Sequence, residues 1–205
     1  MSAAAPLVFV IDDDASVRKG LARLLTAAGY LAETFPSADA FLARWLPDPV
    51  PGCALLDIMM PGIDGLELQR RLLDAPHRLP IVFITGHGDV PSSVSAMKAG
   101  AVDFLPKPFR DEDLLRSIRE ALQRDARDRR ERAERSRVLR RYETLTPRER
   151  EVMAGVARGM LNKQIAHELG LSEKTVKIHR ARVMEKMQVQ SVPDLVLARQ
   201  KLPPV

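Results

Sequence analysis

Cysteine and long apolar runs are almost absent from this chain of 205 residues. Its single cysteine, Cys53, cannot form an internal disulfide, and its place inside an apolar run favours a buried structural thiol. No window approaches the ~18 uncharged apolar residues of a membrane helix, and residues 1–6 lack the length and basic start of a signal peptide. We therefore expect a soluble, cytoplasmic protein that does not act at a membrane.

Charge is divided unequally along the chain. The total net charge is +5, yet residues 1–120 hold 12 Lys and Arg against 16 Asp and Glu, a net charge of −4. Residues 121–205 hold 20 against 11, a net charge of +9. A hydrophobic content of 45% over this length allows two modest cores. We expect two domains, the C-terminal one binding a polyanion, with nucleic acid favoured over a membrane surface.

Short apolar runs alternate with segments of helical period in the first part of the chain. This pattern is typical of a parallel sheet covered by helices on both faces. The predicted fold is therefore α/β, with a doubly wound, five-stranded parallel sheet and a ligand crevice at the carboxyl ends of the strands. The predicted strands are residues 7–11, 31–35, 53–56, 81–84 and 102–105.

Glycine and proline are absent from Glu112 to Tyr142, where Arg, Glu, Asp and Ala dominate. We predict one long charged helix here, supported by opposite charges four residues apart, such as Asp125 and Arg129. Most of it is expected to be a solvated linker. The alternative is a weak dimerisation seam, although its apolar spacing is irregular. That seam would comprise Leu122, Ala126, Ala133 and Leu139.

The C-terminal part opens with a capping box, Thr146 to Glu149, which marks the start of a helix. A short helix capped by Asn162, a turn at Gly170 and a longer helix capped by Ser172 should follow. This is the helix-turn-helix pattern, and a further helix is expected over residues 191–200. The predicted divisions are a first domain of residues 1–121, a charged helical linker of residues 122–143 and a small all-α domain of residues 144–205.

The longer helix of this motif has two faces at helical spacing. Val176 and Val183 should face inward, while a basic face fits the major groove of DNA. We predict base contacts from Lys174, Lys177 and Ile178, and phosphate contacts from the remaining basic residues. The predicted DNA-binding residues are Lys163, Lys174, Thr175, Lys177, Ile178, Arg180 and Arg182.

Polar residues follow four of the predicted strands. Asp57 ends the third apolar run, and Asp12 and Asp13 follow the first. Thr85 and Lys107 follow the fourth and fifth. Because the carboxyl ends of parallel strands meet at one edge of the sheet, these side chains should share a pocket. The sequence therefore predicts a phosphorylatable, magnesium-dependent aspartate.

Magnesium suits this pocket because it keeps several waters and needs only one or two carboxylates besides a phosphate group. Asp13 and Asp57 would supply the carboxylates, and the cation would offset their mutual repulsion. Asp57 would be the nucleophile, Lys107 a positive charge on the phosphate and Thr85 a hydroxyl donor. The competing class is a hydrolase with an aspartyl nucleophile. Such enzymes typically place a second Asp two residues later, where this chain has Met59.

The motifs of both parts resemble one known family. The first part is similar to the response-regulator receiver domain, which is flavodoxin-like. The whole chain resembles the FixJ/NarL class, in which a receiver precedes a LuxR-type helix-turn-helix domain. The stretches that carry the resemblance are residues 10–14 (VIDDD), 56–62 (LDIMMPG), 84–89 (ITGHGD), 96–101 (AMKAGA), 107–109 (KPF), 145–152 (LTPREREV), 162–166 (NKQIA) and 175–179 (TVKIH).

This resemblance implies that Asp57 accepts a phosphoryl group from a partner histidine kinase. It implies that Mg²⁺ binds to Asp13, Asp57 and the backbone carbonyl of Met59, with Asp12 acting through water. A protein of this class catalyses only its own phosphoryl transfer and slow dephosphorylation, so we do not expect an enzyme.

The resemblance also implies a switch pair, Thr85 and Phe104. Phosphate would draw the hydroxyl inward, and the aromatic ring would follow. Phe104 has no hydroxyl, so it can be buried in either state at little polar cost. Receivers would dimerise through Val94, Lys98 and Phe104, and the Lys107-Pro108 peptide would be cis.

The expected function is a two-component response regulator that becomes a homodimer on phosphorylation. It would bind double-stranded promoter DNA and activate transcription, with RNA polymerase as a further partner. Dimerisation raises operator affinity because it raises the effective concentration of the second DNA-binding head. The alternative is a constitutive DNA-binding regulator whose receiver acts without phosphorylation. A standalone phosphatase is a third reading.

Overall fold

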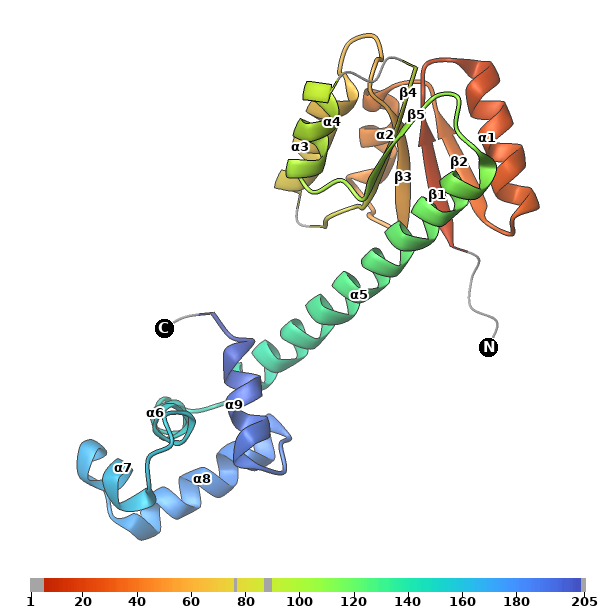
Figure 1. The fold of residues 1–205 in the computed structure, drawn as a ribbon. Helices are drawn as coiled ribbons and strands as arrows, with labels where there is room; N and C mark the ends of the chain where they lie inside the picture. The colour runs from red at the N-terminus through yellow and green to blue at the C-terminus, as the bar shows by residue number, and fades with distance from the viewer. Residues whose placement is uncertain (1–5, 76, 87–89, 204–205) are drawn as a thin grey trace. The chain divides into compact units, whose positions relative to one another are not determined.

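The computed structural model describes residues 6–75, 77–86 and 90–203 and contains two compact units (Figure 1). Unit 1 is Met1–Asp128 and unit 2 is Arg129–Val205, so the division falls within the long helix. Motif residues 87–89 lie outside the described residues. None of the helices in the described ranges combines the length and hydrophobicity that a bilayer span requires.

Unit 1 is built on a five-stranded, parallel sheet with the strand order β2-β1-β3-β4-β5. The predicted doubly wound fold is therefore confirmed. β1 and β3 lie side by side near the centre, where the strand order reverses. The strands are β1 (Leu7–Ile11), β2 (Leu31–Phe35), β3 (Gly52–Asp57), β4 (Ile81–Thr85) and β5 (Asp103–Pro106).

Helices cover both faces of the sheet and bury a core on each (Figure 1). Successive residues of β1 point to opposite faces, so Phe9 and Ile11 enter one core while Val8 and Val10 enter the other. α2, α3 and α4 contribute to the first core, and α1 and α5 to the second. These helices are α1 (Ala15–Ala27), α2 (Ala38–Trp45), α3 (Gly65–Asp74), α4 (Val90–Lys98) and α5 (Asp111–Glu143).

A buried carboxylate joins α5 to the start of β3. Asp125 is 3% exposed, and its carboxylate accepts a hydrogen bond of 3.1 Å from the backbone N–H of Gly52. A Cβ atom at Gly52 would collide with the carbonyl oxygen of Leu7, so only glycine fits there. Next along β3, the Cys53 thiol is fully buried, and burial together with the charge of Asp125 raises its pKa.

Unit 2 is a small helical domain. Its core contains Val152 from α6, Val176 and Val183 from α8 and Leu195 from α9. Val138, from the last turns of α5, is also buried in this core. The helices after α5 are α6 (Pro147–Ala157), α7 (Asn162–Leu169), α8 (Glu173–Met187) and α9 (Val192–Gln200).

The caps of these helices match the sequence at most positions, with one correction. The capping box is present, since Glu149 accepts from the Thr146 N–H at 2.9 Å and Thr146 Oγ1 accepts from the Glu149 N–H at 3.3 Å. Asn162, however, is the first helical residue and not the cap. Leu161 occupies the cap position, and its N–H donates to Gln164 Oε1 at 2.8 Å. The Gln164 side chain therefore satisfies the backbone N–H of the cap residue.

Glu149 also fixes α8 against α6. Its side chain is 2% exposed, and Lys186 Nζ on α8 donates to its Oε2 at 2.7 Å. Lys186 also donates to the carbonyl of Thr144 at 3.2 Å. Burial alone would raise the pKa of Glu149, but the hydrogen bonds from Lys186 and Thr146 outweigh it and hold the pKa below its ordinary value. One carboxylate thus caps α6 and anchors α8.

Replacement of Asp125 by alanine is expected to lower the free energy of unfolding of unit 1 by about 1–3 kcal/mol, because the buried Gly52 N–H loses this acceptor. Unfolding in urea can be followed by the fluorescence of Trp45, the single tryptophan, which is fully buried in unit 1. Asp128→Ala is the matched control, since the Asp128 side chain on the same helix is 30% exposed. Equal losses in both variants would contradict an anchoring role for Asp125.

A Glu149→Gln variant should destabilise unit 2 by about 1–3 kcal/mol at neutral pH, because Lys186 loses its charged partner. A carboxylate with a lowered pKa stabilises the fold above its unfolded pKa, and that stabilisation disappears as the pH falls through the folded pKa. The difference between the wild type and the variant should therefore shrink as the pH falls below about 4.5, the ordinary value.

Methyl resonances of Val152 and Val156, recorded during heating of the full chain, would measure this difference. Glu151→Gln is the control, because Glu151 is exposed and pairs with Arg148. A loss of stability in Glu149→Gln that stays constant from neutral to acidic pH would rule out the ion pair as its cause.

Candidate functional site

The carboxyl ends of four strands bring the predicted pocket residues to one edge of the sheet. Asp57 pairs with Ile84, and Thr85 pairs with Pro106, so β3, β4 and β5 end in register. Asp12 directly follows β1, which lies beside β3. Asp12, Asp57 and Thr85 are all buried.

Lys107 joins two of these carboxylates. Its Nζ lies 2.8 Å from Asp12 Oδ2 and 3.0 Å from Asp57 Oδ1. Its backbone N–H donates to the carbonyl of Thr85 at 2.7 Å, and the Lys107-Pro108 peptide is cis, as expected. The loop after β5 therefore places a positive charge between the ends of β1 and β3.

Burial and charge perturb the two partners in this contact. Burial raises the pKa of Asp57 above its ordinary value of 3.8, and the hydrogen bond and charge of Lys107 only partly oppose this. Burial lowers the pKa of Lys107, but its hydrogen bonds to Asp12 and Asp57 outweigh that effect and the pKa lies above 10.5. Lys107 is consequently a cation at neutral pH.

The turn after Asp57 holds that carboxylate by its backbone. Asp57 Oδ2 accepts from the N–H of Met59 at 2.9 Å, whereas the Met59 side chain is 66% exposed. Gly65 N–H donates to the carbonyl of Ile58 at 2.9 Å. A Cβ atom at Gly65 would collide with the carbonyl oxygen of Asp57, so α3 can start here only with glycine.

The predicted metal ligands are only partly gathered. Asp12 and Asp57 converge on Lys107, while Asp13 lies exposed in the turn after β1. Among the described residues, no three acidic, histidine or cysteine side chains form a ready metal cluster. Mg²⁺ does not require one, because it uses one or two carboxylates and retains waters. The oxygen donors present therefore fit this cation.

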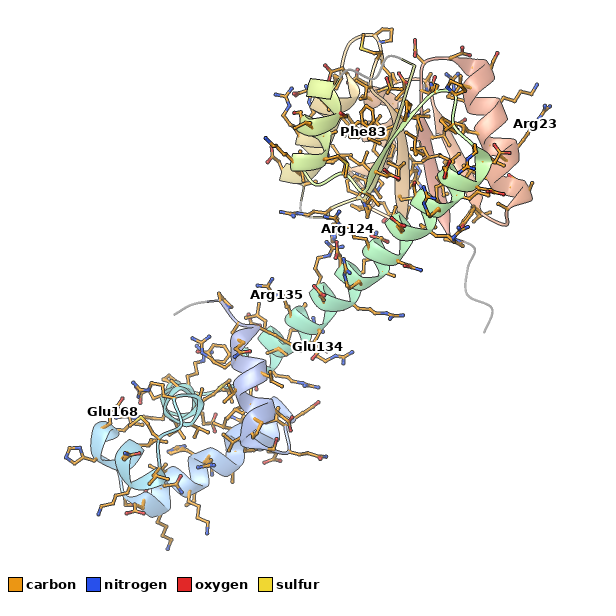
Figure 2. All side chains as sticks on the ribbon, viewed as in Figure 1. Arg23, Phe83, Arg124, Glu134, Arg135 and Glu168 are labelled. Carbon is orange, nitrogen blue, oxygen red and sulfur yellow. The ribbon has the colours of Figure 1, made fainter. Side chains whose placement is uncertain are left out.

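The predicted switch and dimerisation residues come from β4, β5 and α4. Phe104 on β5 is half-buried, and its ring centre lies 6.4 Å from that of Phe83 on β4, which Figure 2 labels within the sheet region. Its N–H donates to Asp103 Oδ1 at 2.8 Å. Val94 and Lys98 on α4 are both exposed.

Two residues near the pocket had no role in the sequence analysis. Asp14 caps α1, with Oδ1 accepting from the N–H groups of Ser16 and Val17 at 2.7 and 3.3 Å. Arg18 donates from Nη1 to the backbone carbonyl of Asp12 at 2.7 Å. An aspartate directly before the helical stripe was a readable cap signal. The contact of Arg18 had no such signal, because it depends on how the turn closes.

The helix-turn-helix elements of unit 2 present the predicted DNA-binding face. Gly170 has φ 65°, a left-handed conformation suited to glycine, and Ser172 Oγ caps α8 by accepting from the Thr175 N–H at 3.1 Å. Val176 and Val183 are fully buried, as predicted. Thr175 and Arg180 are half-buried, and the exposed members of the predicted set are Lys163, Lys174, Lys177, Ile178 and Arg182.

Arg180 already has a partner within the motif. Its Nη1 donates to Asn162 Oδ1, at the start of α7, at 3.1 Å. The hydroxyls of Thr175 and Ser172 are 2.8 Å apart. The side chains that remain directed to solvent on this face therefore combine lysine and arginine charges with the apolar surface of Ile178, which is 47% exposed.

Comparisons with known proteins agree with this architecture. The family model for the response regulator receiver domain matches residues 8–119, and that for bacterial regulatory proteins of the luxR family matches residues 143–198. Nodulation protein W of Bradyrhizobium diazoefficiens is 46% identical over 190 residues, which cover 93% of this chain and 83% of that protein. Transcriptional regulatory protein FixJ of Rhizobium meliloti is 43% identical over 189 residues, 92% of each.

A solved structure supports the same assignment. The response regulator StyR superimposes with a TM-score of 0.84 at 48% identity, covering 97% of this chain and 100% of that one. The resemblance seen in the motifs is thus confirmed, and the domain pair implies a histidine kinase partner and DNA binding. This chain belongs to the two-component response regulators that join a receiver to a LuxR-type DNA-binding domain, a family of transcription regulators that are not enzymes.

Proposed function

We propose that phosphorylation of Asp57 switches this regulator on and that it then binds promoter DNA as a dimer. The observation that carries the proposal is the contact of Lys107 Nζ with both Asp12 and Asp57, at 2.8 and 3.0 Å. A buried carboxylate next to a fixed cation can receive a phosphoryl group whose developing charge the cation stabilises.

In the proposed transfer, a carboxylate oxygen of Asp57 forms a P–O bond while the P–N bond of a phosphohistidine on the kinase breaks. The kinase imidazole leaves and takes up a proton. Lys107 would then contact a phosphate oxygen in place of a carboxylate, and the Thr85 hydroxyl would donate to another. The Met59 N–H holds the second oxygen of Asp57 in place throughout.

Magnesium would be held by Asp13, Asp57 and the backbone carbonyl of Met59, with Asp12 bound through water. When bound, it supplies positive charge that offsets the phosphoryl oxygens. Support comes from the donor set, because the exposed Asp13 and buried Asp57 provide the two carboxylates that Mg²⁺ accepts beside its waters.

The proposed switch passes from the pocket to the face formed by α4 and β5. Thr85 is buried at the end of β4, where its carbonyl accepts from Lys107, and Phe104 is half-buried on the neighbouring strand. Inward movement of the Thr85 hydroxyl would let the Phe104 ring turn further against Phe83. The proposed dimer contact comprises Val94, Lys98 and Phe104.

A dimer would place two DNA-binding heads on paired half-sites. Lys174, Lys177 and Ile178 are proposed to contact base edges, while Lys163, Thr175, Arg180 and Arg182 position the protein on the backbone. The bound dimer would activate transcription, with RNA polymerase as a further partner. It would act in the cytoplasm, where both the kinase and the promoter are found.

Beryllofluoride, a phosphoryl mimic, should convert the protein to a dimer in the presence of Mg²⁺. Light scattering of the full chain would measure this as a doubling of mass. Asp57→Ala should stay monomeric under the same conditions, because it lacks the oxygen that the mimic requires. An unchanged wild-type mass would exclude receiver dimerisation and favour the constitutive alternative.

Removal of the Lys177 side chain should cost about 1–3 kcal/mol of operator affinity and relax the preference at the contacted base. Removal of Arg182 should weaken binding evenly across sequences and lower the salt slope by about 1. Fluorescence anisotropy on a selected operator and on scrambled DNA, at several salt concentrations, separates the two effects. Lys201→Ala is the control because Lys201 is exposed after α9 and pairs with Glu134. Equal losses in all three variants would mean that total charge, not this face, determines binding.

A further inference from the structure

Asp12 is held at every polar atom. Its backbone N–H donates to the carbonyl of Phe35 at 3.2 Å, and its Oδ1 accepts from the Asp14 N–H at 2.9 Å. Its Oδ2 accepts from Lys107 at 2.8 Å. Its backbone carbonyl accepts from Arg18 Nη1 at 2.7 Å. The first three contacts belong to the sheet, the turn after β1 and the pocket, and the fourth has no part in the function described above.

The last contact closes a loop within the chain. Asp14 caps α1 through the N–H groups of Ser16 and Val17, so the helix begins at Ala15, directly after the turn that contains Asp12 and Asp13. Arg18 lies in the first turns of that helix and reaches back six residues to Asp12. A guanidinium donating to a carbonyl at this distance makes a charge-assisted hydrogen bond, which is stronger than a neutral one. The turn between β1 and α1 is therefore tied at both ends.

Holding the Asp12 carbonyl also orients Asp13. The carbonyl of Asp12 and the nitrogen of Asp13 belong to one planar peptide unit, so fixing the first fixes the plane that carries the second. Asp13 itself is exposed and is therefore not held by burial. The direction of its carboxylate thus depends on the backbone of the turn. Arg18 holds this backbone at the Asp12 carbonyl, and the Asp12 carboxylate holds it at the Asp14 N–H.

We propose that Arg18 is a positioning residue for divalent metal binding, acting through the Asp12-Asp13 peptide on the carboxylate of Asp13. This inference rests on the proposed function, in which Asp13 binds the metal. Groups that orient a metal ligand from outside the coordination sphere commonly affect affinity as strongly as a weak ligand does.

Arg18 has two opposite effects on metal affinity. A guanidinium beside the acidic turn repels a cation, so its removal would tighten metal binding if charge alone mattered. Its removal also frees the Asp12-Asp13 peptide, which weakens binding if positioning matters. Arg18 is half-buried at the surface, where solvent screens its charge, so the positioning effect should dominate.

Titration of the full chain with Mn²⁺, an oxygen-seeking stand-in for Mg²⁺, tests this role. Electron paramagnetic resonance counts the free Mn²⁺ and so gives affinity without any phosphoryl transfer. Arg18→Ala should bind Mn²⁺ about tenfold more weakly than the wild type. Arg18→Lys should recover most of the loss, because its ammonium keeps the charge and can still donate to the carbonyl. Thermal unfolding of each variant shows whether unit 1 remains folded.

Arg23→Ala is the matched control. Arg23 lies on the same helix and is exposed, and its side chain extends away from unit 1 in Figure 2. Its removal takes away the same charge and leaves the turn intact, so Mn²⁺ affinity should stay at the wild-type value. A loss in Arg23→Ala as large as in Arg18→Ala would show that the loss does not depend on the contact with the Asp12 carbonyl, and would overturn the positioning role.

Asp13→Asn separates this inference from the proposed function. If the wild type binds no Mn²⁺, or if Asp13→Asn binds it equally well, the proposed metal site fails and the role of Arg18 falls with it. If Asp13→Asn weakens binding but Arg18→Ala binds as tightly as the wild type or more so, only the positioning role is wrong. In the Asp13→Asn background, Arg18→Ala should cost far less than tenfold, because its route to the metal is already lost.

Discussion

The charge of Lys107 between Asp12 and Asp57 is the constraint on which unit 1 depends. Burial and the charge of Asp12 both raise the pKa of Asp57, and the hydrogen bond and charge of Lys107 oppose this. The parallel sheet delivers all three groups to one edge, and the Thr85 carbonyl fixes the backbone of Lys107. This arrangement satisfies the pocket, and it would leave the pocket short of positive charge if Asp57 received the phosphoryl group proposed above.

Unit 2 uses a buried ion pair for a different purpose. Glu149 and Lys186 join α6 to α8 behind the DNA-binding face, and Glu149 also caps α6. The pair fixes the recognition helix against α6, because Lys186 on α8 donates both to Glu149 and to the carbonyl of Thr144. In both units a partly exposed lysine therefore meets buried carboxylate oxygens, since the Lys107 side chain is 25% exposed and that of Lys186 is 34% exposed.

The sequence predicted that Asp12, Asp57 and Lys107 meet at one edge of the sheet, because each lies at the end of an apolar run and the ends of parallel strands meet. It predicted Asn162 wrongly as a cap, because the choice between adjacent residues depends on which backbone leaves the helix first. Leu161 is the cap instead, and its N–H is satisfied by Gln164 Oε1. The contact of Arg18 was not predicted, and Asp125 was predicted only as a partner of Arg129 within the charged helix. Asp125 lies in a charged helix whose local pattern indicates solvent, yet it meets Gly52 across 73 positions of sequence. Contacts at such separations leave no periodic trace in the chain.

The buried thiol of Cys53 has a practical consequence. With its pKa raised by burial and by Asp125, the sulfur holds its proton and is shielded from reagents while β3 stays in the sheet. Since it is the single cysteine of the chain, its rate of modification by a thiol reagent counts the molecules in which the centre of the sheet has opened. Because Cys53 does not react with such reagents in the folded protein, one cysteine introduced on the surface of either unit could be labelled with a probe without labelling of Cys53.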